Sequence, residues 1–438
     1  MWPLFGFRAN PYSQEVLAPD ESGDALLAGR DQEIANLQRR IGSGGAHASV
    51  EGPIGAGKTS MINVAVYRMA KMCMQAKAKE LYLPATAALQ PRQDVDAFVG
   101  DLFRVLAQTL IRYQDSFKAV GLQEPKVDEI DRWLNSPQYE SWSGGAQALG
   151  FGGEVGRGSE PNTGDGYTRT GFETSVRNEL ARVFEGGTGG IVCILDNLEI
   201  LKTSGDAKLV LDELRDRVFN IQGVRWVLCG SRGIVSRART ERLSGIIQAP
   251  VVMKALDQPS AVDAIRRRIA YYGDATAEAP VTPEGFEFLY TAMHQNLRDS
   301  MERAQNFSSW VVETVLDEGR DLPSPDDRDQ LLKIWLLEQA EAAYHDARGI
   351  QPRVWQFFVQ LANNGGRAGS SEYRDYNFAN QQQMTSSVTA LQEVNLVSRE
   401  LDPENGARTI NSVTALGWLV YFYAGDFEAI PKDSVTAD

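Results

Sequence analysis

One run of eight residues has the spacing that binds a phosphate chain: Gly52-Pro53-Ile54-Gly55-Ala56-Gly57-Lys58-Thr59. It fits the pattern G-x-x-x-x-G-K-[ST], in which the glycines let backbone N–H groups curl around a β-phosphate. The apolar run 47–51 before it predicts a strand, and the apolar periodicity from Met61 onward predicts a helix. A loop between a strand and a helix start is the context that this chemistry requires, because the helix start adds a positive dipole end.

Two side chains of this loop have separate expected roles. Lys58 is expected to reach the β- and γ-phosphates, and the Thr59 hydroxyl is expected to ligate Mg²⁺. Ser60, the next residue, is included in the same expected contact set. ATP and Mg²⁺ are therefore the predicted cofactors.

The phosphate loop also needs a carboxylate at the tip of a neighbouring strand. The buried apolar run 191–195 ends in Asp196, which is predicted to share the magnesium shell with Thr59. The chain continues Asp196-Asn197-Leu198-Glu199. Glu199 is either the base that orients the attacking water or a solvated residue at the start of a loop. If Asn197 occupies the usual base position, hydrolysis should be slow, because an amide can position water but cannot take its proton.

Four further residues are candidates for contacting the nucleotide or sensing its state. Ser231, just after the strand run 224–228, is predicted to touch the γ-phosphate, with Arg232 as the next choice. Arg242 is interpreted either as an arginine finger that points into a neighbouring subunit or as part of a solvated face. Arg298 begins an expected lid helix after Asn296 and is placed to sense nucleotide.

The fold class follows from how strand and helix patterns alternate along the chain. Short apolar strands alternate with helices up to about residue 250, which predicts an α/β core with a parallel sheet covered on both faces. Beyond Pro250 the strand signal disappears and helical periods predict an all-α lid. After that, two helices and a small hairpin predict a winged helix-turn-helix. The predicted domains are 1–45 (N-terminal linker and helix), 46–256 (P-loop core, with a glycine-rich insertion at 141–170), 257–345 (lid) and 346–438 (winged helix).

Together these motifs resemble the AAA+ and STAND-type P-loop ATPases. In arrangement the chain is most similar to origin-recognition and replication-initiator ATPases and to ATPase regulators of transposition and phage defence. The resemblance depends on the loop and Asp196, on a preamble with Gly29, Arg30 and Glu33, on Ser231, on Asn296-Leu297-Arg298 and on the terminal winged helix. It implies ATP binding between core and lid with Arg30 and Arg298 at the site, and oligomerisation or partner docking that nucleotide governs.

Two features depart from that resemblance. The order Asp196-Asn197-Leu198-Glu199 is closer to the D-x-L-[DE] of STAND switches than to the adjacent Asp-Glu of AAA+ machines. The glycine-rich segment 141–170 has no obvious counterpart.

Charge limits how the chain can bind DNA. It has 44 basic and 58 acidic residues, a net charge of −14, which excludes a generally cationic coat. The candidate recognition helix offers Gln382 and Gln383, which can read adenine edges, and the wing offers Arg399 and Arg408 for phosphates. A winged helix that docks protein would look much the same, so DNA and a protein partner both stay open.

The remaining composition indicates a cytoplasmic protein. The three cysteines have neither disulfide nor zinc spacing, and no apolar run approaches the ~20 residues of a membrane span. Two function classes are compatible with the sequence. The first is an ATP-hydrolysing switch that forms a homo-oligomer with ATP and engages DNA or a partner protein. The second is a nucleotide-gated interaction module with negligible turnover and no direct DNA binding.

Overall fold

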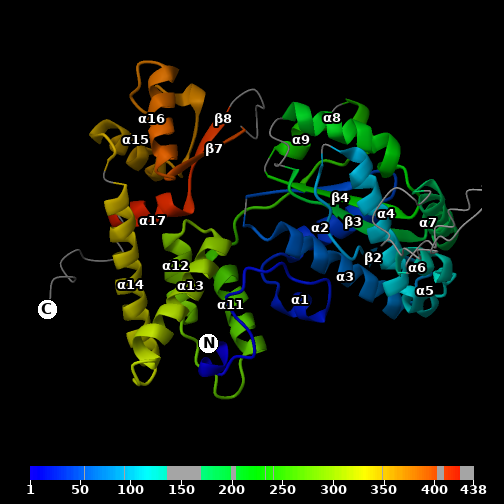
Figure 1. Cartoon of the computed structure of the whole chain (residues 1–438), viewed down its shortest axis with the longest axis horizontal. Coiled ribbons are helices and arrows are strands. Elements are labelled where there is room, and N and C mark those ends of the chain that lie inside the picture. Colours follow the sequence, from blue (N-terminus) through cyan, green and yellow to red (C-terminus); the bar gives the residue numbers. More distant parts are fainter. Residues whose placement is uncertain are drawn as a thin grey trace, which may run out of the picture.

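A computed structural model describes residues 1–53, 55–92, 94–135, 169–198, 204–231, 233–239, 241–347, 349–401 and 409–424. These residues form an α/β lobe and a helical lobe, with a small winged-helix module on the helical lobe (Figure 1). Three clusters of buried apolar side chains underlie this division. Most of the predicted insertion, 136–168, lies outside the described residues.

The α/β lobe is built on a five-stranded parallel sheet in the order β2-β3-β4-β1-β5. Its strands are β1 (Ala48–Glu51), β2 (Leu81–Pro84), β3 (Gly189–Leu195), β4 (Val224–Gly230) and β5 (Val251–Val252). Because all strands are parallel, their carboxyl ends share one edge, where β4 separates the ends of β1 and β3. The expectation that strands end before residue 250 was wrong, because β5 is too short to show a period of two.

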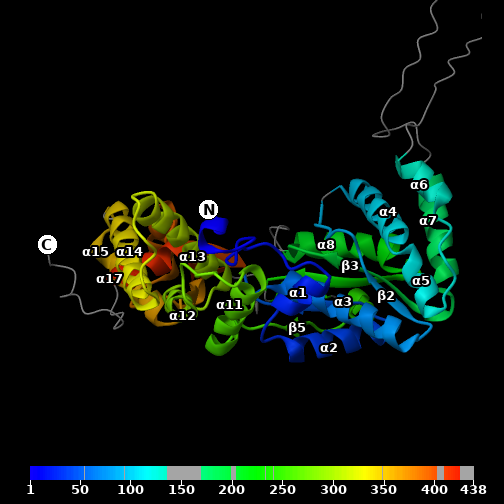
Figure 2. The same ribbon diagram turned by 90° about the horizontal axis from the view of Figure 1, so that it is seen from below.

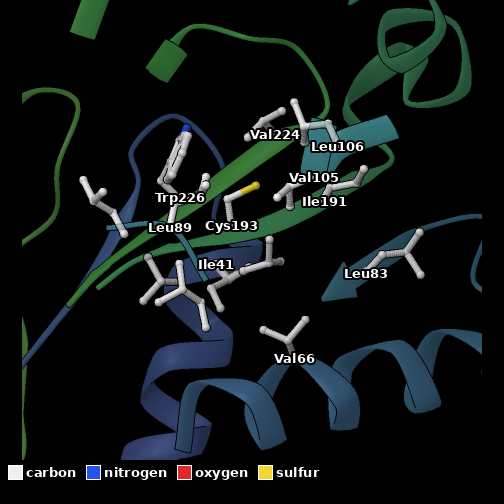
Figure 3. Close-up of a cluster of buried hydrophobic side chains, with 14 of the residues drawn as sticks. Ile41, Val66, Leu83, Leu89, Val105, Leu106, Ile191, Cys193, Val224 and Trp226 are labelled. Carbon is white, nitrogen blue, oxygen red and sulfur yellow. The ribbon is translucent and has the colours of Figure 1, made fainter. Parts of the chain in front are cut away.

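Helices cover both faces of this sheet (Figure 2). The helices α2 (Asp31–Gly42) and α3 (Lys58–Ala76) lie on one face, and α4 (Val95–Arg112) and α8 (Ser204–Leu214) lie on the other. Side chains from both faces meet the strands in one apolar cluster, part of which Figure 3 shows around Cys193 and Trp226. Further helices at the sheet's end are α5 (Gln114–Val120), α6 (Asp128–Asn135) and α7 (Arg169–Val183).

The lid contains four helices: α11 (Gln258–Tyr272), α12 (Pro283–Ala292), α13 (Leu297–Val311) and α14 (Pro325–Asp346). Each begins at a polar cap whose side chain accepts a backbone N–H bond, which is why the chain starts helices at these points. The N-terminal aromatic residues Phe5, Phe7 and Tyr12 are buried in the lid cluster, whereas α2 packs with the core. The domain limits predicted from the sequence stay predictions, and these contacts show what each boundary segment packs against.

The C-terminal module has the element order of a winged helix. Its elements are α15 (Pro352–Asn363), β6 (Arg367–Gly369), α16 (Gln381–Glu393), β7 (Val397–Leu401), β8 (Thr409–Val413) and α17 (Ala415–Ala424). The strands form an antiparallel sheet in the order β6-β8-β7. The fold class predicted from the sequence is therefore confirmed: a parallel-sheet P-loop core, a helical lid and a winged helix. None of the helices in the described ranges combines the length and apolar character of a membrane-spanning segment.

Candidate nucleotide-binding site

The phosphate loop joins β1 to α3 at the carboxyl edge of the sheet. Gly55 and Gly57 have φ angles of +78° and +79°, in the left-handed region that glycine adopts without steric cost. Lys58 is the first residue of α3 and is buried. Its Nζ donates to the carbonyl oxygens of Gly52 at 3.1 Å and Pro53 at 3.0 Å, so the ammonium lies across the inside of the loop. Ile54 is outside the described residues.

Thr59 and Asp196 meet across the sheet edge, as expected. The Thr59 hydroxyl donates to Asp196 Oδ2 at 2.7 Å, and the N–H of Asn197 donates to Asp196 Oδ1 at 2.8 Å. A second bond, from the Asp196 N–H to the Leu89 carbonyl at 2.8 Å, fixes the backbone after β3. A hydroxyl and a carboxylate that converge beside a phosphate loop are the oxygen donors that Mg²⁺ prefers, so these residues fit that ion.

Asn197 and Glu199 are the two candidates for positioning the attacking water, and the structure describes only Asn197. Asn197 has φ +57°, a left-handed conformation that asparagine tolerates better than most residues. Its N–H bonds to the Asp196 carboxylate directly after the strand end. Glu199 lies outside the described residues, so its role as a base stays a prediction.

Ser231 lies at the carboxyl end of β4, between the loop strand and the Asp196 strand. Gly230 pairs with Glu51, and Leu228 pairs with Leu195. The half-buried Ser231 therefore follows β4, the strand that separates the phosphate loop from Asp196. Its contact with a γ-phosphate stays a prediction. Arg232, the second choice, is outside the described residues.

The lid contacts the phosphate loop through the residues of the Asn296-Leu297-Arg298 motif. Asn296 caps α13 by accepting N–H bonds from Arg298 at 3.1 Å and Asp299 at 3.3 Å. A Cβ on Gly55 would come within 2.6 Å of Asn296 Oδ1 and 3.1 Å of Arg298 Cβ. Gly55 is thus required both for its backbone angle and for this approach of lid to loop. Arg298 itself is exposed at the start of α13.

Arg30, which the resemblance implies at the nucleotide site, lies against the phosphate loop, and its contact with a nucleotide stays a prediction. Its guanidinium is buried and bonds to Ala56 of the loop, to Lys254 and to Glu33. Arg242, on the short helix α10 (Glu241–Ser244), is exposed, which is compatible with either of its two interpretations.

Two contacts at the site were not expected from the sequence. Buried Glu51, the last residue of β1, accepts bonds from the N–H of Ser236 at 2.8 Å and its hydroxyl at 3.0 Å, which ties the loop strand to α9 (Ile234–Ala238). The Leu17 N–H donates to Ser60 Oγ at 3.1 Å, and Asn63 Nδ2 donates to the Leu17 carbonyl at 2.9 Å. The N-terminal segment therefore crosses the start of α3. A carboxylate at the end of an apolar strand was the only signal for Glu51.

The candidate DNA-binding residues have partners inside the winged helix. Gln383 Oε1 accepts from the Ala379 N–H at 3.3 Å and from Arg353 Nη2 at 3.4 Å. Arg399 Nε donates to Asn411 Oδ1 at 3.4 Å. Gln382 is exposed on α16, and Arg408 lies outside the described residues. Arg353, which the sequence analysis did not single out, places a cation from α15 beside the first turn of α16.

A ring stack joins the lid turn to the C-terminal module. His294 precedes Asn296 in a tight turn with φ +50°, and its ring lies parallel to that of Trp418 at 3.9 Å between centroids. Trp418 belongs to α17 and also packs on Gly366, where an added Cβ would lie 2.3 Å from the indole. Contacts therefore run without a gap from Gly55 through the turn 294–298 to the start of β6.

Comparison with known proteins finds likeness only among solved structures, since no family model and no curated protein matches the chain. The ORC2 protein of Aeropyrum pernix, in ADPNP-ADP complexes, is 14% identical with a TM-score of 0.47, covering 95% of this chain and 97% of that chain. The Aeropyrum pernix ORC1 protein in complex with DNA is 14% identical with a TM-score of 0.41, covering 93% and 96%. CDC6P from Pyrobaculum aerophilum is 12% identical with a TM-score of 0.37, covering 94% and 96%.

Proposed function

We propose that this protein is an ATP-binding, slowly hydrolysing switch whose nucleotide state controls how its winged helix engages a target. The observation that supports it most directly is the 2.7 Å bond between Thr59 and Asp196 beside a loop spanned by Lys58. A buried lysine whose donors face loop carbonyls can exchange those partners for phosphate oxygens. Few other ligands match this combination of cation, backbone N–H groups and carboxylate.

Mg²⁺ would be held by the Thr59 hydroxyl, with Asp196 in its surrounding shell, and would neutralise charge on the phosphates. Lys58 would bind the β- and γ-phosphates, and Ser231 would contact the γ-phosphate. Glu199 is the proposed base. Slow turnover is expected because the residue next to Asp196 is Asn197, which cannot accept a proton from water.

Control of the winged helix would follow from the chain of contacts at the lid. Arg298 and Asn296 lie against Gly55, and His294 of the same turn stacks on Trp418. A phosphate that displaces the turn 294–298 from Gly55 would therefore also change how α17 packs against that turn. Because packed interfaces tend to have discrete arrangements, a small shift there can reorient the module.

Assembly into an ATP-bound homo-oligomer is part of the same proposal, with Arg242 as the residue that would reach a neighbouring site. The exposed position of Arg242 leaves its side chain accessible to a neighbouring subunit. Mass in solution with ATP, with ADP and with neither tests it. Arg242→Ala should keep ATP binding and lose the larger species.

The target of the winged helix is either DNA or a protein. The position of Arg353 at the first turn of α16 favours a phosphate-bearing target, because phosphate contacts dominate DNA affinity. Fluorescence anisotropy of a labelled duplex, with and without ATP, distinguishes the two. No binding in any nucleotide state would assign the module to protein docking.

The proposal as a whole is tested by calorimetric titration of ATP with Mg²⁺ and by phosphate release. Saturable binding that Lys58→Ala removes would support it. Equal binding by wild type and Lys58→Ala would refute the assignment of the site.

A further inference from the structure

Arg30 is a buried cation with one partner in the phosphate loop, one after β5 and one on α2. It is 4% exposed. Its Nη2 donates to the Ala56 carbonyl at 3.1 Å and to the Lys254 carbonyl at 2.9 Å, and its Nη1 pairs with Glu33 at 3.0 Å. The planar guanidinium holds its donors in a fixed fork, which serves these three acceptors in set directions.

The bond to Ala56 determines how the phosphate loop presents its next N–H group. The peptide that joins Ala56 to Gly57 is planar and trans, so its carbonyl and its N–H point in opposite directions. Arg30 holds the carbonyl and thereby turns the Gly57 N–H to the other side. Gly57 follows this peptide and Gly55 precedes Ala56, both with φ near +78°, and glycine has more backbone freedom than other residues. The bond from Arg30 is an anchor outside the loop that favours one orientation of the peptide.

The hydrogen bond from Arg30 to the Lys254 carbonyl connects the phosphate loop to the lid. Lys254 follows β5 and lies in the linker that leads to α11, and the preceding residue, Met253, bonds through its N–H to the Glu51 carbonyl at 2.7 Å. A Cβ on Gly29 would lie 2.4 Å from Ser260 Cβ, so the turn before Arg30 packs directly on α11. One nitrogen of Arg30 thus holds the loop and the lid linker together.

We propose that Arg30 is a positioning residue of the nucleotide site, which orients the Ala56–Gly57 peptide toward the phosphates and couples that orientation to the lid linker. This inference rests on the proposed function, since it assumes that the loop binds a nucleotide. Arg30 acts through the backbone and not by touching the phosphates. A lid movement that draws Lys254 away removes one bond from the same nitrogen that holds Ala56. Lid position therefore regulates phosphate affinity through this side chain.

The test compares Arg30→Ala and Arg30→Lys with a matched control, Arg328→Ala. Arg328 is also 4% exposed and also pairs with a glutamate at 3.0 Å, but it lies in the lid beside Glu278. Calorimetry with ADP gives the affinity of each variant, and thermal unfolding without nucleotide gives its stability. Hydrogen exchange of the peptide that contains residues 55–60, with and without ADP, reports on the loop itself.

Arg30→Ala should weaken ADP binding by about tenfold or more, the size of one lost hydrogen bond to a charged group. Arg30→Lys should fall between it and wild type, because an ammonium keeps the charge but cannot reproduce the spacing of the guanidinium fork. ADP should protect the loop less in both variants than in wild type. Arg328→Ala should lose stability to a similar degree and bind ADP within about twofold of wild type, since it is remote from the loop.

Equal ADP affinity in the Arg30 and Arg328 variants would overturn the inference. So would full protection of the loop by ADP in Arg30→Lys, which serves as the test if Arg30→Ala does not fold. The proposed function fails in a different way, when wild type and Lys58→Ala bind ADP alike. The two failures are therefore distinguishable in one set of titrations.

Discussion

The edge of the parallel sheet and the face of the winged helix use polar side chains in opposite ways. At the sheet edge, Lys58 and Thr59 begin α3 and Asp196 follows β3. Backbone carbonyls hold Lys58, and Thr59 and Asp196 bond to each other. On the winged helix, Gln383 and Arg399 bond to neighbours within the module. Buried polar groups that lie close together indicate which ligand chemistry a site can bind. Exposed polar groups that hydrogen-bond to each other stabilise the fold but do not identify a ligand. The structure thus indicates a nucleotide at the first region and leaves two targets at the second.

Removing the cation at the sheet edge should give the largest effect. Lys58→Ala is expected to reduce ATP and ADP affinity by about a thousandfold, because no other described side chain spans the inside of the loop and charge-assisted bonds to phosphate are strong. Calorimetric titration measures it. Lys71→Ala, on the same helix beside Tyr67, is the control and should bind as wild type. A Lys58→Ala protein that retains wild-type affinity would mean that the convergence at the edge is structural.

The base assignment predicts the next largest effect. Glu199→Gln should lower ATP turnover by roughly a hundredfold, at the lower end of what a general base contributes, while ATP affinity stays the same. Asn197→Ala should change turnover less, because its side chain cannot take a proton. Steady-state phosphate release with parallel binding curves checks both. The reverse ranking of the two variants would assign the water to Asn197.

Much of this edge was predictable because its signals are local in the sequence. The loop motif, Asp196 at the end of an apolar strand and the cap Asn296 each appear within a few residues. The contacts that were missed join distant segments, such as Glu51 with Ser236 and Leu17 with Ser60, and nothing in either partner alone marks them. The cation beside α16 was missed for the same reason, since Arg353 belongs to the preceding helix.

Acidic pH should lower the free energy of unfolding of the α/β core because one buried histidine, His47, resists protonation in the folded state. His47 is buried, where Nε2 contacts the Phe219 carbonyl at 2.7 Å and Nδ1 accepts the Trp226 N–H at 3.2 Å. Burial lowers the pKa of His47 from 6.5 to about 4. Its folded-state pKa lies below the unfolded one, so this contribution is complete above pH 6.5 and is lost as the pH falls toward 4.

Between pH 8 and pH 5 the expected loss from His47 is about 2 kcal/mol. Urea unfolding at the two pH values measures it. His47→Gln should abolish most of that difference, whereas His345→Asn, on α14, should retain it. An unchanged pH dependence in His47→Gln would show that other groups cause the acid sensitivity.

Substitutions in the winged helix should have the smallest effects, smaller than those at the sheet edge. If the target is DNA, Arg353→Ala and Arg399→Ala should each reduce the salt slope by about 0.9, the value for one phosphate contact. Anisotropy of a labelled duplex over a salt series in the presence of ATP measures this. Slopes that match wild type in both variants would remove these arginines from any phosphate interface.

The central claim, that nucleotide at the sheet edge controls the winged helix, is tested most directly by hydrogen exchange of the C-terminal module with and without ATP and Mg²⁺. We expect ATP to change protection in α17 and in residues 352–393 of wild type. We expect no such change in Lys58→Ala, and a much smaller one in His294→Ala, which should still bind ATP. If calorimetry shows that wild type binds ATP while exchange across α15, α16 and α17 stays the same, the site and the module are not coupled.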